Sequence, residues 1–136
     1  MSAIVSPGLR RLVMMRANHR CEYCLLPEAV ALHRHEPDHI VPLQHGGATE
    51  ENNMACACFR CNRHKGPNIG SYDPVTGLLT PLYYPRRQTW SDHFKLNGAR
   101  IEPLTPEGRV TVFILQLNAP ERVRERDLLF AAGYYP

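Results

Sequence analysis

Apolar residues recur at helical spacing near the beginning of the chain. Leu9, Leu12 and Val13 share one face of a predicted helix over residues 6–18, and Ser6-Pro7 precedes them as N-cap and first-turn residues. Four basic side chains lie on or near this helix: Arg10, Arg11, Arg16 and Arg20. They form either the solvated face of a packing helix or a face that contacts phosphates.

Two more helices are predicted in the last third of the chain. Thr105-Pro106-Glu107 opens the first, which buries a face of four apolar residues: Val110, Phe113, Ile114 and Leu117. Its β-branched content would also suit a strand. The second helix extends from Pro120 to Ala132 and ends at Gly133, since glycine commonly follows the last helical residue.

Residues 66–108 are rich in proline and glycine, which indicates turns. Leu78 to Tyr84 predicts a short strand, and Pro81 favours an edge position because proline cannot donate a hydrogen bond to a neighbouring strand. A basic and aromatic set follows: Arg86, Arg87, Trp90 and His93. These residues form either a DNA-binding surface or, through Trp90, part of the core.

Length and composition indicate one globular domain over residues 1–136. The chain has 43% hydrophobic and 21% charged residues, a composition typical of a folded globular protein and not of a disordered one. Its formal net charge of +3 permits a nucleic-acid partner without requiring one. There is no apolar run of the roughly 18 residues that a membrane span needs, and no secretory signal pattern, so we expect a cytoplasmic protein with no membrane partner.

Four of the five cysteines form two C-x-x-C pairs, Cys21/Cys24 and Cys58/Cys61. In the cytoplasm, cysteines act as thiols or metal ligands rather than as a disulfide framework. Two such pairs can complete a tetrahedral four-thiolate site, so we predict a structural Zn²⁺. Cys56 lies in an apolar run and is expected to pack as a small buried hydrophobe. The alternative, Cys56 as a ligand in place of Cys58, would break the C-x-x-C spacing.

Candidate catalytic residues lie between the two cysteine pairs and just after the second. Hydrolysis of a phosphodiester requires a base that takes a proton from water, and the imidazole of His39 suits this task near neutral pH. It also requires a hard cation on oxygen ligands, and Asp38 and Asn62 offer a carboxylate and an amide oxygen. This donor set favours catalytic Mg²⁺ or Mn²⁺ over zinc.

The order of these motifs resembles that of the HNH endonuclease family. Four elements match the core motif of the family in order: the run Asp38-His39-Ile40-Val41-Pro42, the turn Gly46-Gly47, the segment Glu51-Asn52-Asn53, and the run from Cys58 to Gly66. The resemblance covers residues 21–66. Residues 66–94 are similar to short stand-alone bacterial HNH proteins, which extends the likeness to most of the chain.

The resemblance implies an α+β fold. A zinc-stapled ββα-metal core over about residues 21–68 would carry an N-terminal helix and a C-terminal helical extension over about residues 69–136. It also implies roles: His39 as general base, Asp38 and Asn62 as ligands of one catalytic metal, and Asn53 as the residue that pins the loop between the strands.

Two positions within the motif differ from a simple match to the family. Asn53, rather than Asn52, is assigned on spacing alone, 14 residues after His39 and nine before Asn62. Gly66 stands where some relatives place a further histidine, so that ligand is absent.

The neighbours Asp38 and His39 raise a geometric question. Side chains of adjacent strand residues point to opposite faces of a sheet. Since Pro37 and Pro42 flank the pair, we expect the strand to end or twist there.

Further basic residues surround the predicted site. Arg63 and Lys65 follow Asn62 on the predicted helix, where cations can meet phosphates, and they are assigned to nucleic-acid binding. His45 is either a solvated loop residue or a DNA contact. His33, His35 and Glu36 have no predicted role.

The sequence therefore predicts an endonuclease that hydrolyses DNA, with RNA as a further possible substrate. The alternative is a zinc-ribbon-like module that binds nucleic acid without cutting it. The set Asp38, His39 and Asn62 favours the enzyme, since binding alone needs no general base.

Overall fold

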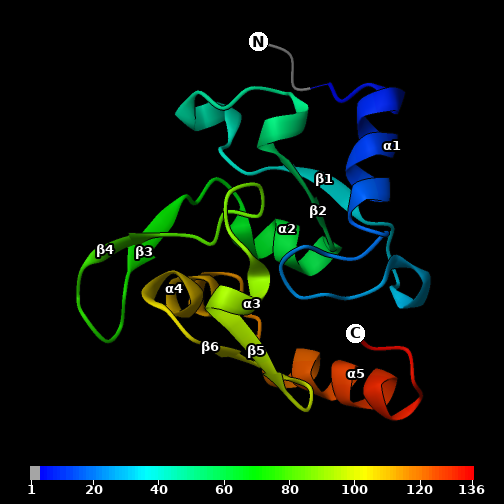
Figure 1. Ribbon diagram of the computed structural model, residues 1–136, viewed down its shortest axis with the longest axis vertical. Helices are drawn as coiled ribbons and strands as arrows, with labels where there is room; N and C mark the ends of the chain where they lie inside the picture. Colours follow the sequence, from blue (N-terminus) through cyan, green and yellow to red (C-terminus); the bar gives the residue numbers. More distant parts are fainter. Residues whose placement is uncertain (1–3) are drawn as a thin grey trace.

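The computed structural model describes residues 4–136 and has three two-stranded antiparallel hairpins among five α-helices in this range. The strands are β1 (Glu36–His39), β2 (Met54–Ala57), β3 (Gly70–Tyr72), β4 (Leu79–Pro81), β5 (Phe94–Asn97) and β6 (Arg100–Pro103). The helices are α1 (Pro7–Arg16), α2 (Phe59–Lys65), α3 (Trp90–His93), α4 (Pro106–Ile114) and α5 (Pro120–Ala131). Figure 1 shows α2 between the part of the molecule that holds α1 and the part that holds α4 and α5. None of the helices within residues 4–136 has the length and apolar character to cross a membrane.

The predicted helices form close to their expected bounds because their end signals are used. The Ser6 hydroxyl accepts a hydrogen bond from the amide of Leu9 and begins α1, and the Thr105 hydroxyl accepts one from Gly108 and begins α4. The segment with β-branched residues is thus helical. Its buried face is narrower than predicted, since Val110 is buried whereas Phe113 is 58% exposed, and the buried Leu117 lies beyond the end of α4.

The ββα core consists of the hairpin β1–β2 followed by α2. In the register of the hairpin, Asp38 lies opposite Ala55 and His39 opposite Met54. Because successive strand residues face opposite sides, Met54 packs with Val13 of α1, whereas Ala55 belongs to the main core. The hairpin is therefore buried on both faces of β2.

Two of the four basic residues around α1, Arg10 and Arg16, fit neither prediction, whereas Arg11 is exposed, as on a solvated face. Arg10 forms an ion pair with Glu36, 3.0 Å between Nη1 and Oε2, and donates to the His35 carbonyl. Arg16 donates to the carbonyls of Glu51 and Met54. These guanidinium groups attach α1 to the hairpin, since they satisfy carbonyl groups that strands and helices leave unpaired.

The C-terminal extension contains more than the two predicted helices. It also has α3, the strand β3 and the hairpin β5–β6, which the apolar pattern did not reveal because these strands have only three or four residues. The predicted edge strand is present as β4, paired with β3. Between β5 and β6, Gly98 has a φ of 59°, which suits a two-residue hairpin loop.

The extension packs against the cysteine-bearing turn of the core. The Trp90 ring lies against Phe94 at a centroid distance of 5.1 Å with a tilt of 34°, and its indole N–H donates to the carbonyl of Tyr23 at 2.9 Å. At the end of the chain, the Tyr135 hydroxyl donates to the carbonyl of Cys24 at 2.7 Å. Trp90 is thus part of the core rather than of a DNA-binding surface.

The loop between β1 and β2 is closed by Asn53. Its amide nitrogen donates to the carbonyls of Val41 and Ala48, and its oxygen accepts from the Val41 amide, all at 2.9 Å. Gly47 lies inside this closure, and a Cβ there would overlap the Val41 carbonyl and crowd the Asn53 side chain. The loop therefore requires glycine at position 47.

Replacing Gly47 with alanine should lower the free energy of unfolding by about 1–3 kcal/mol, the usual cost of forcing extra volume into a packed site. Gly8→Ala is the matched control, because nothing lies within 4 Å of a Cβ at Gly8 and the residue is in α1. Denaturant unfolding of both variants with zinc present measures the difference. Equal stability of the two variants would contradict the close packing of this loop.

Candidate functional site

The four predicted cysteines converge at one buried point. Cys21 and Cys24 lie in the turn after α1, Cys58 is the N-cap of α2, and Cys61 lies within α2. Their sulfur atoms all lie within 4.8 Å of one another. Four sulfurs bound to one zinc at about 2.3 Å would be roughly 3.8 Å apart, so the cluster suits a tetrahedral structural zinc.

Cys56 lies outside this cluster, as predicted. It is fully buried, and its Sγ is 3.6 Å from the sulfur of Met14, on the α1 side of the hairpin. Burial raises the pKa of the Cys56 thiol to about 12, so the side chain stays neutral and packs as an apolar group.

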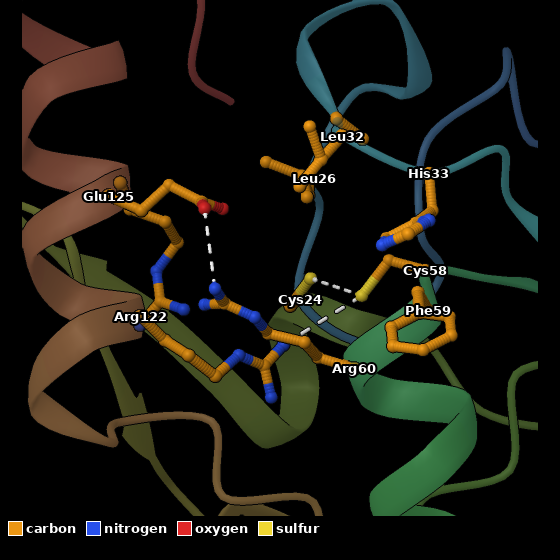
Figure 2. Close-up of a pocket in the computed structure, with 11 residues that line it drawn as sticks. Cys24, Leu26, Leu32, His33, Cys58, Phe59, Arg60, Arg122 and Glu125 are labelled. Atoms are coloured by element: carbon orange, nitrogen blue, oxygen red, sulfur yellow. Dashed lines mark hydrogen bonds and ion pairs between the residues drawn. The ribbon is translucent and has the colours of Figure 1, made fainter.

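A buried arginine from the C-terminal helix completes the cysteine cluster. Arg122 of α5 has its Nη2 3.1 Å from Cys61 Sγ. The same nitrogen is 3.8 Å from Cys58 Sγ, and Figure 2 shows the Arg122 side chain pointing toward Cys58. Burial lowers the pKa of Arg122, but the neighbouring Cys61 and Cys24 sulfurs outweigh this effect and raise it above its ordinary value. Since a zinc ion with four thiolates carries two negative charges, Arg122 supplies a compensating positive charge.

The sequence did not single out Arg122. It lies in the charged run Glu121–Asp127, which has the composition of a solvated helix face. Its spacing of four residues from Arg126 places both arginines on the same side of α5, where both are buried, but such spacing of charged residues does not by itself indicate burial.

The candidate catalytic residues line one open pocket at the end of β1. Asp38, His39 and Asn62 contribute to a cavity of about 520 Å³, together with Arg10 and Gly66. The strand ends at His39, as expected. The three candidate catalytic residues, which come from β1 and α2, therefore line the same pocket.

Asp38 is only 5% exposed and makes an ion pair with a buried lysine. Its Oδ2 lies 3.1 Å from Lys65 Nζ and accepts a hydrogen bond from the Tyr23 hydroxyl at 3.1 Å. Burial raises the pKa of Asp38, whereas the charge of Lys65 opposes this shift. Oδ1 has only a longer contact with Lys65, at 3.4 Å.

The position of Lys65 differs from the predicted one. Its side chain is 1% exposed, so its ammonium does not lie at a surface where phosphates bind. The ammonium donates instead to the His39 carbonyl at 2.9 Å, in addition to its pair with Asp38. The physical reason is that an acidic residue buried in β1 requires a positive partner, and α2 brings Lys65 to it.

The remaining predicted residues are distributed around this pocket. His39 Nε2 lies 2.9 Å from the Thr49 hydroxyl. Arg63 is exposed, with its guanidinium 5.3 Å from the Phe59 ring centroid. His45 is an exposed loop residue whose Nε2 lies 3.1 Å from the Pro67 carbonyl oxygen, and His35 is fully buried.

Cys21→Ser should abolish zinc binding and the cooperative unfolding of the core, since one of four thiolates is lost and metal binding is coupled to folding. Cys56→Ser makes the same chemical change outside the cluster. It should keep one zinc per chain and lower the free energy of unfolding by about 1–3 kcal/mol. Elemental analysis and denaturant unfolding measure both effects. Zinc-free parent protein would contradict the site, and loss of zinc in Cys56→Ser would mean a different ligand set.

Lys65→Met should destabilise the fold by about 3–5 kcal/mol, because it leaves the buried carboxylate of Asp38 without its partner. The double variant Asp38→Asn/Lys65→Met should be more stable than Lys65→Met alone, since it removes the uncompensated charge as well. Unfolding of both single variants and the double variant gives the coupling energy. Purely additive effects would show that the pair is not formed in solution.

Comparison with known proteins supports the resemblance seen in the motifs. The model of the HNH endonuclease family matches residues 21–68. Neither the curated proteins nor the solved structures contain a significant match to the chain. The matched segment includes all four cysteines and the residues of the open pocket from Glu36 to Pro67. Residues 21–68 are therefore similar to the HNH endonuclease family, and outside this segment the chain has an N-terminal helix and a C-terminal extension.

Proposed function

We propose that the protein is an endonuclease that hydrolyses DNA phosphodiester bonds with one divalent metal ion, in the cytoplasm. The observation that carries this proposal is that Asp38, His39 and Asn62 all line one open pocket within the segment that matches the HNH family. RNA has the same phosphodiester chemistry and is the second possible substrate. A protein that binds nucleic acid without cutting it needs neither a general base nor a catalytic metal. It would therefore not need these three residues together.

The residues present fit a hard divalent cation. Asp38 Oδ2 takes the two short contacts, so that Oδ1, with one contact at 3.4 Å, keeps lone pairs for a metal. Asn62 is partly exposed and offers its amide oxygen. Mg²⁺ or Mn²⁺, when bound there, would neutralise negative charge that develops on the phosphoryl oxygens.

His39 is the proposed general base. A neutral imidazole has one N–H donor and one acceptor nitrogen. In the tautomer in which Nε2–H donates to the Thr49 hydroxyl, Nδ1 is the nitrogen that accepts a proton from the attacking water. The three hydrogen bonds of Asn53 close the loop that carries Thr49, and this supports a positioning role for Asn53.

Lys65 acts in this proposal as a positioning residue. Its ammonium contacts both the carboxylate of Asp38 and the main-chain carbonyl of His39, so one group fixes the metal ligand and the base relative to each other. Lys65 is three residues after Asn62 on α2, which connects the second proposed ligand to the same arrangement. Arg63, which is exposed, remains the candidate for a phosphate contact.

One observation favours a second candidate function. The Lys65 ammonium already balances the negative charge of the Asp38 carboxylate, so no metal ion is needed to balance it. It would suit a zinc-containing module that binds nucleic acid and does not cut it.

A plasmid-nicking assay separates the two functions. With Mg²⁺ or Mn²⁺, His39→Ala should lower turnover by about 10²–10⁴-fold while keeping zinc and fold, since it removes only the proton acceptor. Asp38→Ala and Asn62→Ala should regain part of their lost activity at high metal concentration, because additional metal compensates for a missing ligand but not for a missing base. His19→Ala, an exposed histidine next to the first cysteine pair, is the control.

Two outcomes of this assay would reject the enzyme. One is a parent protein that binds DNA but leaves it intact with either metal. The other is a His39→Ala variant that cuts as fast as the parent protein at every metal concentration.

A further inference from the structure

A second cavity, of about 250 Å³, lies beside the cysteine cluster and shares no lining residue with the pocket of Asp38, His39 and Asn62. Figure 2 shows its main walls. Leu26 and Leu32 lie on one side, and the rings of His33 and Phe59 lie on another. Arg60 and Glu125, joined by an ion pair, form a further wall.

The ring wall is a stack that stays in contact with solvent. His33 lies on Phe59 with a centroid distance of 4.4 Å and an interplanar angle of 29°, and the Arg63 guanidinium is 5.3 Å from the Phe59 centroid. Phe59 is 40% exposed and Leu32 94% exposed. Large apolar groups left in water around a cavity are typical of a binding site.

The polar wall contains the Arg60 guanidinium, whose N–H donors are not all used within the described part of the protein. Arg60 Nη2 lies 3.8 Å from Glu125 Oε2, and both side chains are 43% exposed, so this ion pair is weak. Its other terminal nitrogen, Nη1, is buried and has no acceptor among residues 4–136. An N–H without an acceptor is costly, so a turn of the weakly paired Arg60 side chain toward an anionic oxygen in the cavity would be favourable.

The size of the cavity limits what it can hold. Sites for whole small molecules are typically about 300–1,000 Å³, so this cavity suits a single planar ring system. Rings and an aliphatic wall favour an aromatic ligand, and Arg60 favours an anion beside it. A nucleotide within a single strand combines both, since its base has a flat apolar face and its phosphate carries the charge.

We propose that this cavity binds an unpaired base of a nucleic-acid strand, with the adjacent phosphate at Arg60. The inference rests on the proposal that nucleic acid is the substrate. Phe59 and Asn62 lie three residues apart on α2, which is about 4.5 Å along the helix axis. A strand anchored by a base at Phe59 would therefore pass close to the pocket of Asp38, His39 and Asn62, and the substrate would need an unpaired nucleotide near the cut.

The test compares two fluorescent single strands of equal length, one with normal bases and one with abasic residues at every position. Both strands carry the same phosphates. The parent protein should bind the base-bearing strand about five- to 150-fold more tightly, the range expected for stacking of one base. His33→Ala and Phe59→Leu should reduce this preference, whereas Phe113→Ala, which removes an exposed ring on α4, should leave it unchanged.

Arg60→Gln should weaken binding of both strands by a similar factor, because it removes a phosphate contact and not a ring. Arg124→Gln, an exposed arginine on α5, is its control. Zinc content is measured for every variant, since Phe59 and Arg60 lie between two of the cysteines. His33 lies outside both cysteine pairs, so its variant tests the stack without disturbing the zinc.

Binding is measured by fluorescence anisotropy without Mg²⁺ or Mn²⁺, so the result does not depend on cleavage. Base-dependent binding by a protein that does not nick DNA would support the cavity and reject the nuclease. Equal affinity of the parent protein for both strands would overturn the inference, whether or not the protein cuts DNA. The rings of His33 and Phe59 would then form a contact surface for a protein partner instead.

Discussion

Four sulfur atoms meet at a point where the chain brings together its beginning, its middle and its end. Cys21 and Cys24 follow α1, Cys58 and Cys61 begin α2, and Arg122 reaches the same sulfurs from α5. A zinc ion bound to these thiolates would hold α2 in place relative to β1–β2, and the proposed catalytic groups are distributed over these two elements. The geometry of the open pocket thus depends on a cluster that takes no part in the chemistry.

The second constraint is the buried pair of Asp38 and Lys65. A carboxylate at 5% exposure is unfavourable unless a partner compensates its charge, and Lys65 does so from the helix that also carries Asn62. The cysteine cluster holds the beginning of α2, and the ion pair holds its far end against β1. Two attachments at opposite ends of a seven-residue helix leave it little freedom to rotate or slide.

Local signals in the sequence predicted much of this architecture. Caps such as Ser6 and Thr105 act within one helical turn, and the C-x-x-C pairs carry their geometry in their spacing, so both were readable without the fold. The burial of Lys65 and Arg122 was not readable. Each depends on a partner distant in the chain, Asp38 in one case and the cysteine cluster in the other, and each lies among charged neighbours typical of a solvated surface. The hairpin β5–β6 was missed because its strands are too short to show alternation.

The involvement of α5 in the cysteine cluster has a consequence for the order of events during synthesis. A ribosome releases all four thiols long before it reaches Arg122, and Tyr135, which donates to the carbonyl of Cys24, emerges later still. A nascent chain that captures zinc early must therefore hold a doubly negative cluster without its counter-charge and with part of its apolar surroundings exposed. The cysteine-bearing core is fully packed only when residues about a hundred positions apart come into contact. Contacts between residues so distant in the chain slow folding. The metal would thus serve first as a nucleus that retains the early segments until the last helix arrives.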